Sequence, residues 1–593
     1  MRSNYFILFL FVLLNFGGYA QLTIRNNAYV YASDVVVFVN DQVNIQESTA
    51  LFYLRDEAQL LQGTGTVGNS GTGLLSVCQW GTVNEYAYNY WCSPVGNTLA
   101  NSVGNRPFRP NNNIYEVMSA PITSAPASFT SGYDGTSSPL VISNYWIWKF
   151  DPGTAYSEWD YVGDSGDVAT AYGFTMKGTN GSGNNQMYDF RGKPNSGTIS
   201  TSVLAEQLTL VGNPYPSALD ARDFIWDTDN QNAITGYLYY WEQAPGATSH
   251  FLSDYVGGYA SYTISSDGLV DSFTPAAFTT YLSNGIPTNF PAGSGNKIAK
   301  RYIPIGQGFM VEGKTGSTGV AYFKNAHRDF VKESDGNSFF FRNQESDTNL
   351  TNSTPISYDE NGLTIVPGDY QRFRINVDFN DTHTRQLLMN FHESASSGFD
   401  YGLEAKSPEF LSSDAHWTWN NDPYCIQAYN FDQDLHIPLI VKSNSQQLIR
   451  FRIFDVQNFD EVQPIYLHDM LTDSYVNLRE QNLELMINAE NYNDRFEITF
   501  TQEALSMDEP ISNSIVVFHN QTTSEIIIKN PNYLTLQQVS LYDITGKEIL
   551  NDVDLSQNQE YHYSTKDLSS GAYIVHLVQD TEHIVSKKII VGH

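Results

Sequence analysis

The chain has few cysteines, few basic residues and few long apolar runs. Its only cysteines are Cys78, Cys92 and Cys425. An odd number leaves at least one thiol without a partner in the chain, and no Cys-x-x-Cys or paired-histidine spacing indicates a zinc site. Cys78 and Cys92 could form a disulfide in an oxidising compartment, so this pair is the candidate bridge. A scaffold that depends on zinc or on many disulfides is therefore disfavoured.

Positive charge is scarce, since 32 Lys and Arg stand against 64 Asp and Glu, for a formal net charge of −32. Such an acidic surface repels phosphate backbones and anionic lipids, so we expect no nucleic-acid partner. The same acidity suits a soluble extracellular protein, and it is compatible with bound Ca²⁺. Residues 227–232 (Asp-Thr-Asp-Asn-Gln-Asn) carry oxygen ligands at alternating positions but lack the Gly and Glu of an EF-hand loop. We favour a solvated loop there and expect no cofactor.

The one marked apolar stretch lies within residues 1–20, behind Arg2 and ahead of small residues. This pattern is typical of a signal peptide, with cleavage predicted between Ala20 and Gln21. The stretch is about a dozen residues long, whereas a membrane-spanning helix needs roughly 20. No later segment is long and apolar enough to span a membrane. We therefore predict export through the periplasm and no transmembrane segment in the mature chain.

Aromatic and turn-forming residues are abundant, with 38 Tyr, 34 Phe, 9 Trp and 43 Gly. They occur in short alternating runs bounded by Gly, Asn or Pro, which is the pattern of strands and tight turns. The length is too great for one hydrophobic core. We therefore predict an all-β, multidomain protein made of β-sandwich modules.

The first part of the mature chain, residues 21–75, contains short strand-like runs broken by Asn and Asp. Such runs suit either the first turns of a β-helix or one edge of a larger sandwich. The sequence does not separate these two alternatives.

Residues 76–345 order the same elements twice: a small-residue and proline turn, an aromatic run and a glycine-flanked run. Each aromatic run precedes a Pro-Gly turn that would close a hairpin. We therefore predict a duplicated β-rich body. The three segments are 90–94, 145–148 and 172–178 in the first half, and 211–216, 237–241 and 305–313 in the second.

Residues 365–503 alternate apolar and polar positions, as in 372–377 (Arg-Phe-Arg-Ile-Asn-Val). A period of two predicts a β-sandwich with its polar face in water. Residues 504–514 are a predicted linker that would leave a cleavable joint before the last module.

The closing segment, residues 515–593, has short β-rich runs separated by turns, which predicts an Ig-like sandwich. It contains three motifs: 539–547 (Val-Ser-Leu-Tyr-Asp-Ile-Thr-Gly-Lys), 568–575 (Leu-Ser-Ser-Gly-Ala-Tyr-Ile-Val) and 586–591 (Ser-Lys-Lys-Ile-Ile-Val). In this order the motifs resemble the type A C-terminal sorting domain of the type IX (Por) secretion system of Bacteroidetes. Where that family has an aromatic residue and Pro-Asn-Pro, this chain has 518–521 (Phe-His-Asn-Gln), so we expect a different first turn.

This resemblance implies recognition by the outer-membrane type IX translocon, cleavage by its sortase-like peptidase, and release or attachment at the cell surface. It assigns the sorting motif to Val539, Leu541, Tyr542, Asp543, Gly546, Lys547, Leu568, Gly571, Tyr573, Lys587, Lys588 and Ile589. Segments 88–94 and 211–216 are also similar to the bodies of large flavobacterial surface proteins with the same sorting domain. That second similarity implies a location and no activity.

Catalytic signatures are missing from the sequence. Residues 163–167 (Gly-Asp-Ser-Gly-Asp) are similar to the segment around a chymotrypsin-like nucleophile, but Asp167 replaces the second glycine and a turn is favoured. There is no His-Glu-x-x-His and no Gly-x-Ser-x-Gly. We therefore predict no catalytic, cofactor-binding or metal-binding residue.

Aromatic side chains are the best candidates for a binding surface. Alternate residues of a strand face opposite ways, so some could form a stacking platform for sugars, although core packing is the default. The candidates are Trp146, Trp148, Trp159, Tyr239, Tyr240 and Trp241.

Two functions remain open. The first is a non-catalytic surface or secreted protein for adhesion, which binds a glycan, a matrix component or another cell. The second is a secreted hydrolase, acting on polysaccharide or protein, with an unrecognised active site. The lack of a nucleophile, metal or paired-acid signature favours the first.

Overall fold

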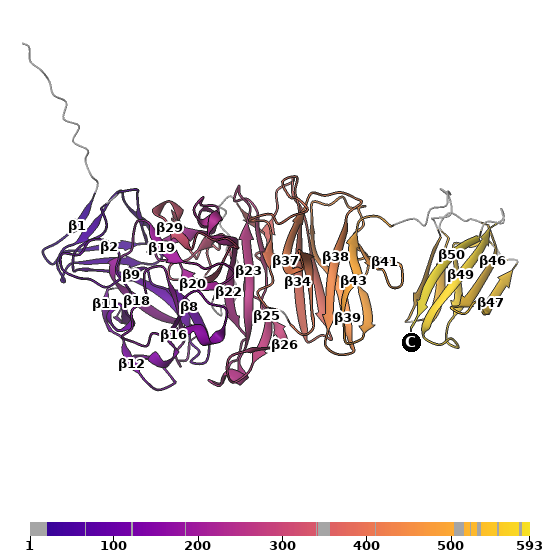
Figure 1. Ribbon diagram of the computed structural model, residues 1–593, viewed down its shortest axis with the longest axis horizontal. Coiled ribbons are helices and arrows are strands. Elements are labelled where there is room, and N and C mark those ends of the chain that lie inside the picture. The colour runs from indigo at the N-terminus through magenta and orange to yellow at the C-terminus, as the bar shows by residue number, and fades with distance from the viewer. Residues whose placement is uncertain are drawn as a thin grey trace, which may run out of the picture. The chain divides into compact units, whose positions relative to one another are not determined.

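The computed structural model describes residues 21–502 and 515–592, except for 66, 120, 121, 184, 340, 342–355, 410, 522, 531–534, 554, 556 and 580–583. The chain forms two compact units, Met1–Gln502 and Glu503–His593, and both are built almost wholly of strands (Figure 1). The all-β, multidomain prediction is confirmed. The predicted signal peptide and linker lie outside the described residues. No helix in the described ranges is long and apolar enough to cross a membrane.

The N-terminal strands coil so that each lies parallel to the strand one turn later, as in a β-helix. Strand β7 (Leu74–Thr82) continues one face of the coil by pairing parallel to β5, and it then pairs antiparallel with β18 (Asn185–Pro194). The coil is thereby joined to the body by a continuous sheet. Its parallel pairs are β1 (Leu22–Ile24) with β4 (Val43–Ile45), β2 (Tyr29–Ser33) with β5 (Leu51–Arg55), and β3 (Val36–Val39) with β6 (Gln59–Gln62).

Two antiparallel sheets in the body have the same strand order. In the first half the order is β8 (Tyr88–Cys92), β17 (Gly173–Lys177), β15 (Trp148–Phe150), β16 (Trp159–Tyr161). In the second half the order is β20 (Leu208–Gly212), β28 (Gly308–Gly313), β22 (Ile234–Gln243), β23 (Val256–Ile264). Both predicted Pro-Gly turns close hairpins, β15–β16 and β22–β23.

The registers of these sheets also match. Lys177 therefore occupies the position of Glu312, and Tyr161 the position of Ser261. The predicted duplication of 76–345 stays a prediction, and this match supports it. The equivalent pairs are Gly173–Cys92 with Gly308–Gly212, Thr175–Trp148 with Met310–Tyr239, and Trp148–Tyr161 with Tyr239–Ser261.

The two halves meet through the same strands, as in a two-fold interface. Cys92 N donates to Gly306 O at 2.9 Å, and the equivalent Gly212 N donates to Ala171 O at 3.2 Å. Glycine is needed where the strands cross, because a Cβ on Gly308 would lie 2.8 Å from the Tyr90 carbonyl carbon.

A third sheet of eleven strands follows in sequence. Its core is shared with the halves, since Tyr90, Tyr239 and Phe373 belong to one cluster of buried side chains. Residues 21–502 are therefore one packed unit. The strands are β33 (Gln371–Phe379), β34 (His383–Phe391), β35 (Ala405–Lys406), β36 (Asp414–Trp419), β37 (Asp422–Tyr429), β38 (His436–Ser443), β39 (Gln447–Gln457), β40 (Tyr466–Asp469), β41 (Ser474–Asn477), β42 (Leu483–Ile487) and β43 (Glu490–Thr499).

The prediction of a polar face in water is wrong for β33. Arg372 and Arg374 are fully buried, because the second half covers that face. Arg372 donates to Asp271 O at 2.9 Å, and Arg374 donates to Phe273 O at 2.6 Å. The alternating arginines therefore donate to backbone carbonyl groups of a neighbouring strand, β24 (Asp271–Thr274), instead of to water.

The other elements of the first unit are short. They are β9 (Val95–Gly96), α1 (Pro110–Asn113), β10 (Ile114–Ser119), β11 (Thr123–Pro126), β12 (Ser128–Thr130), β13 (Thr136–Ser137), β14 (Leu140–Ser143), β19 (Ile199–Ser202), β21 (Ala218–Asp220), α2 (Ala221–Ile225), β25 (Ala277–Tyr281), β26 (Pro287–Ser294), β27 (Tyr302–Ile303), β29 (Val320–Phe323), β30 (Arg328–Asp329), β31 (Ser357–Tyr358) and β32 (Thr364–Ile365). Single 3₁₀ turns occupy Asn144–Trp146, Tyr156–Glu158, Asn230–Asn232, Leu252–Asp254 and Asn325–His327.

The second unit is a two-sheet sandwich around its own core. One sheet has the order β44 (Val516–Asn520), β45 (Glu525–Lys529), β48 (Glu560–Ser564). The other has the order β47 (Glu548–Val553), β46 (Leu536–Asp543), β49 (Gly571–Gln579), β50 (Ile584–Val591). Strands β47 and β48 lie between the motifs 539–547 and 568–575, in a stretch where the sequence analysis names no strand.

Candidate functional site

The two equivalent sheets of the body differ in what covers them. In the second half Tyr239 is 3% exposed and lies in the core shared with the eleven-stranded sheet. Ser261 is 1% exposed, and its Oγ donates to Lys406 O at 3.1 Å. Tyr161, which takes the position of Ser261 in the first half, is 55% exposed. The first half therefore exposes, at Tyr161, a position of this face that is buried in the second half, while Tyr90 and Phe150 on the same face lie in the shared core.

Five aromatic side chains, which we call the aromatic patch, gather at and beside this exposed position. The rings of Trp148 and Tyr161 meet edge to face with centroids 5.1 Å apart. Trp148 Nε1 donates to Tyr145 O at 2.7 Å, and the Tyr145 ring lies 4.9 Å from that of Tyr133. The 3₁₀ turn Tyr156–Glu158 places Tyr156 just ahead of β16, and burial and then Tyr145 raise the pKa of Tyr156. The patch is Tyr133, Tyr145, Trp148, Tyr156 and Tyr161.

Local structure explains why these rings turn outward. The 3₁₀ turn Asn144–Trp146 breaks the strand ahead of β15, so Tyr145 and Trp146 leave the sheet in different directions. Tyr145 is exposed and Trp146 is buried. In β16 the alternation of the strand keeps Trp159 partly buried against Tyr90 and directs Asp160 outward.

A buried lysine lies beneath the patch, in what we call the lysine cluster (Lys177, Tyr88, Trp146, His250 and Tyr255). Lys177 Nζ is 3.5 Å from the centre of the Trp146 ring and 4.9 Å from those of Tyr88 and Tyr255. It also donates a short hydrogen bond to the Tyr255 hydroxyl. This contact set fixes Trp146 and Tyr255 as the floor of the patch.

The lysine cluster is joined to the surface through a histidine. His250 Nδ1 lies 2.9 Å from Lys177 Nζ, and Nε2 lies 2.7 Å from Asp134 Oδ1. Burial lowers the pKa of Lys177 to about 6, and it also lowers the pKa of His250. Both groups are therefore mainly neutral at pH 7. This geometry fits the tautomer in which Nε2–H donates to the carboxylate.

The aromatic residues that the sequence offered as candidates differ in their surroundings, since some lie in the core and others at or near the patch. Tyr239 and Tyr240 are core residues, as the default for such runs expects. Trp148 belongs to the patch, while Trp159 and Trp241 are partly buried around Tyr90 and Tyr259. Sequence reasoning did not single out the exposed residues Tyr133, Tyr145, Tyr156 and Tyr161 or the lysine cluster. The strand that contains Trp159 offered a signal for Tyr161, because residues two positions apart in a strand lie on the same face.

The other candidates from the sequence are occupied by structural contacts. Cys78 and Cys92 are free thiols on strands of different sheets, and Cys425 is a buried free thiol. Asp227, the first residue of the candidate calcium loop, accepts from Lys324 Nζ at 2.8 Å and contacts His327 Nε2 at 2.9 Å. Those ion pairs use the carboxylate internally. No group of three or more His, Cys, Asp or Glu within the described ranges could hold a metal ion.

Residues 163–167 form a surface turn. Gly163 has φ +60°, a backbone conformation that favours glycine, and Asp167 pairs with Arg109 at 2.9 Å.

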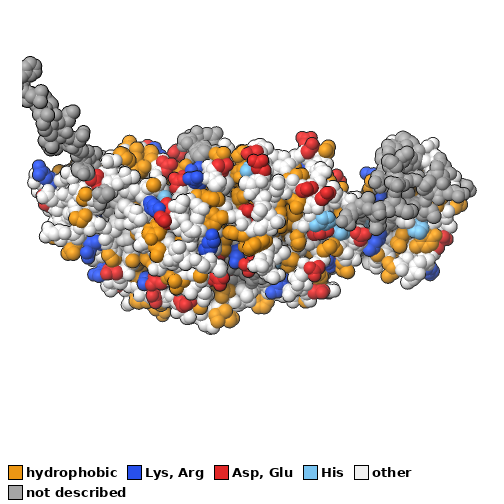
Figure 2. Space-filling model, turned by 45° about the horizontal axis from the view of Figure 1, so that its top comes forward, with side chains coloured by type: hydrophobic (Ala, Val, Ile, Leu, Met, Phe, Trp, Pro, Cys, Tyr) orange, Lys and Arg blue, Asp and Glu red, His pale blue; other side chains and the backbone are white. Residues whose placement is uncertain are grey.

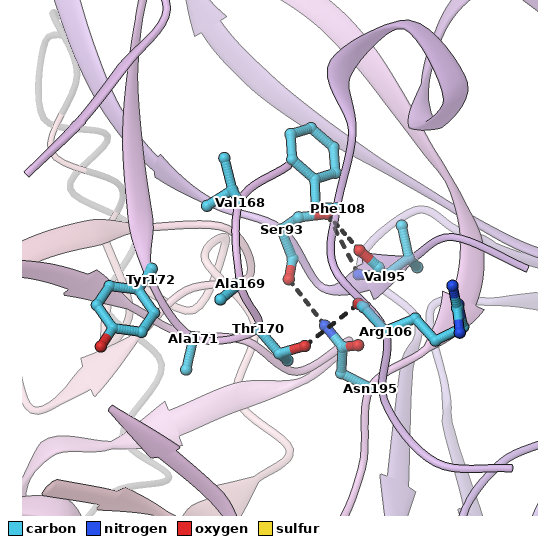
Figure 3. Close-up of a pocket in the computed structure, with 10 residues that line it drawn as sticks. All are labelled: Ser93, Val95, Arg106, Phe108, Val168, Ala169, Thr170, Ala171, Tyr172 and Asn195. Carbon is cyan, nitrogen blue, oxygen red and sulfur yellow. Dashed lines mark hydrogen bonds between the residues drawn. The ribbon is translucent and has the colours of Figure 1, made fainter. Parts of the chain in front are cut away.

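One pocket lies at the junction of the halves (Figure 3). The empty space among its lining residues is ≈ 170 Å³, part of it open to solvent, and Ser93, Asn195 and Ala171 are among the residues that line it. Asn195 Nδ2 donates to Ser93 O at 3.0 Å, and Figure 3 shows the Arg106 guanidinium directed away from the other lining residues. A space this small does not accommodate an oligosaccharide. The aromatic patch is therefore the better candidate for a binding site.

The face of the molecule drawn in Figure 2 shows no large continuous apolar area. Figure 2 shows hydrophobic side chains in small groups, interspersed with polar atoms and with more acidic than basic residues.

The predicted sorting residues lie on three strands and one turn of the second unit. Asp543 shapes that turn, because its Oδ1 accepts from Thr545 N at 2.9 Å and from Lys547 N at 3.0 Å, while Gly546 has φ +80°. Strand β46 carries Val539, Leu541, Tyr542 and Asp543; the turn carries Gly546 and Lys547; Leu568 precedes β49, which carries Gly571 and Tyr573; β50 carries Lys587, Lys588 and Ile589. Val539, Leu541, Tyr573 and Ile589 are core residues.

Comparison with known proteins gives two family matches. Residues 14–500 match a family described as a domain of unknown function (DUF8693), and residues 516–592 match a secretion system C-terminal sorting domain. No curated protein matches the chain.

Two solved structures have a distant likeness. One is titled a biofilm associated protein, BSP domain, with 10% identity, a TM-score of 0.14 and coverage of 75% of this chain and 87% of that chain. The other is the extracellular domain of a putative one component system from B. thetaiotaomicron, with 9% identity, a TM-score of 0.11 and coverage of 65% and 61%. TM-scores this low carry no argument about fold or function.

The sorting domain shows that the chain is exported by type IX secretion, to the cell surface or the extracellular space. Since the first match spans most of the chain, the protein belongs to the family described as a domain of unknown function, DUF8693, and carries a type IX secretion sorting domain at its C-terminal end.

Proposed function

We propose that residues 21–502 form a non-catalytic binding module for adhesion, which holds a carbohydrate on the aromatic patch. One observation carries the proposal: the first half exposes Tyr161 at the position where the second half buries Ser261 under another sheet. A protein exported to the cell surface encounters glycans and matrix polymers there. Exposed rings held rigidly in this way are suited to stacking on the apolar face of a sugar ring.

The polar groups of the patch suit the same ligand. Tyrosine hydroxyls and the neighbouring carboxylates can accept or donate hydrogen bonds to sugar hydroxyls, while the rings supply apolar contact. The lysine cluster holds the floor of the aromatic patch in place, so little side-chain entropy is lost when a ligand stacks on the patch. The patch has no nucleophile with an adjacent base, which favours binding over hydrolysis.

The proposal is tested with the mature chain on a glycan array, followed by calorimetry with the best oligosaccharide. Trp148→Ala and Tyr145→Ala should each weaken binding about 5- to 20-fold, since one ring contact contributes about 1–2 kcal/mol. Tyr29→Ala is the matched control, because it removes an exposed tyrosine from the N-terminal coil and should leave binding unchanged.

Two outcomes contradict the proposal. Absence of saturable binding to any arrayed glycan would remove the binding role. Release of shortened oligosaccharides during incubation would instead support a secreted hydrolase.

A further inference from the structure

The charges around the aromatic patch do not balance. Asp134 is 59% exposed and follows Tyr133 in the chain. Asp160 lies on the other face of β16 from Tyr161, where it shares Lys149 (3.6 Å) with Asp151 (2.6 Å). The acidic residues beside the patch are therefore Asp134 and, three residues after Tyr161, Asp164.

The partners of Asp134 do not neutralise it. Its carboxylate contacts His250, and the chain continues to Lys177. Both groups lose their charge readily, because burial lowers the pKa of each. Near pH 7 the Asp134 charge therefore faces the patch without a compensating cation from this chain of contacts.

A second carboxylate has a neutral partner as well. Asp164 Oδ1 accepts from Asn144 Nδ2 at 3.2 Å. Asp164 follows Tyr161 by three residues, and its charge, after burial, raises the pKa of Tyr161. Asp134 and Asp164 together give the rim of the patch its negative charge.

We propose that the ligand of the aromatic patch is a polysaccharide that carries free amino groups, a hexosamine polymer without full N-acetylation. The inference rests on the proposed carbohydrate-binding function. An ammonium group on a stacked sugar meets the Asp134 or Asp164 carboxylate at the edge of the rings, which adds a charge-assisted hydrogen bond to the stacking. A uronic-acid polymer meets the same carboxylates with repulsion.

The experiment compares three oligosaccharides of equal length by calorimetry on the mature chain. They are a glucosamine oligomer, its fully N-acetylated form and a galacturonate oligomer, at about pH 6.5 and low ionic strength, where surface charges are screened least. The glucosamine oligomer should bind about 5-fold or more tightly than its acetylated form, and the galacturonate oligomer most weakly.

The Asp134→Asn and Asp164→Asn variants locate the effect. Each should reduce the preference for the free amine about 3-fold or more while leaving affinity for the acetylated oligomer unchanged. Asp369→Asn, which removes an exposed charge from outside the two halves, is the control for net charge and should keep the full preference. Midpoints of thermal unfolding show whether each variant is folded.

The outcomes separate this inference from the proposed function. Equal affinity for the amine and acetyl oligomers, or tighter binding of galacturonate, overturns the inference and leaves carbohydrate binding standing. An unchanged preference in Asp134→Asn and Asp164→Asn also overturns it. Absence of binding to all three oligomers and to the glycan array overturns both.

Discussion

The two halves of the body share strand order, register and mutual contacts, yet they differ in how much of the equivalent face is covered. The second half turns Tyr239 and Ser261 into core residues under the eleven-stranded sheet. The first half leaves the equivalent Trp148 partly buried and Tyr161 exposed. The same backbone framework therefore serves as a packing platform in one half and as a candidate binding surface in the other.

The two halves also differ in the ionisable side chain that they bury at equivalent positions. Lys177 of the first half is enclosed by aromatic rings, whereas the equivalent Glu312 accepts from the Tyr237 hydroxyl at 2.8 Å. Trp146 and Tyr237 each stand two residues ahead of the equivalent Trp148 and Tyr239. One half thus holds an amine against rings and the other holds a carboxyl against a phenol.

The largest expected change in stability comes from removing the equivalent aromatic side chains of the two halves. Tyr239→Ala should lower the free energy of unfolding by about 3–5 kcal/mol, because a fully packed ring leaves a cavity. Trp148→Ala, at the equivalent open position, should cost about 1 kcal/mol or less. Chemical unfolding of the mature chain measures both. Equal losses would show that the open face is packed as tightly as the covered one.

A second test addresses the symmetric crossing of the halves. Gly308→Ala and Gly173→Ala should each destabilise the fold by about 1–3 kcal/mol, because the added Cβ would lie 2.8 Å and 2.6 Å from atoms of the other half. Gly571→Ala, whose Cβ meets no atom within 4 Å, is the control and should change the unfolding midpoint little. A neutral Gly308→Ala would contradict the close crossing.

A third test uses pH. The folded-state pKa of Lys177 is lowered by burial to about 6, so the unfolded chain binds more protons between about pH 6 and 10. Stability from this group is therefore greatest above pH 10 and is lost as the pH falls toward 6, by at most about 1.4 kcal/mol per unit. Lys177→Met should remove that slope from unfolding curves measured across this range.

Glu312 gives the opposite sign, which makes Glu312→Gln the matched variant. Burial raises its pKa above the ordinary value, so its contribution is fully present below the unfolded pKa. That contribution is lost as the pH rises through the raised folded pKa. Slopes of the same sign for the two variants would contradict the comparison.

The smallest expected effect concerns single hydrogen bonds. Ser261→Ala should cost about 1 kcal/mol, because the bond from its hydroxyl to Lys406 O is buried. Tyr161→Phe, at the equivalent open position, should leave the unfolding midpoint unchanged. A larger loss for Tyr161→Phe would indicate that its hydroxyl is tied into the fold.

Particular elements show how far sequence patterns reach. Repeated turn and glycine-flanked motifs predicted two similar halves, and the Asp-Ile-Thr-Gly-Lys run predicted a turn that the Asp543 carboxylate closes. Strands β47 and β48 were missed because their polar sequences bury few side chains. The arginines of β33 were assigned to water because alternation cannot show that a second sheet covers the polar face.

The sequence by itself determined the all-β class, the export address and the sorting module, because these depend on local turn chemistry, strand periodicity and short motifs. Only the tertiary structure decided which aromatic residues are open and which carboxylates lack a cation. That choice depends on long-range packing, since the same strand pattern is buried where another sheet covers it and exposed where none does.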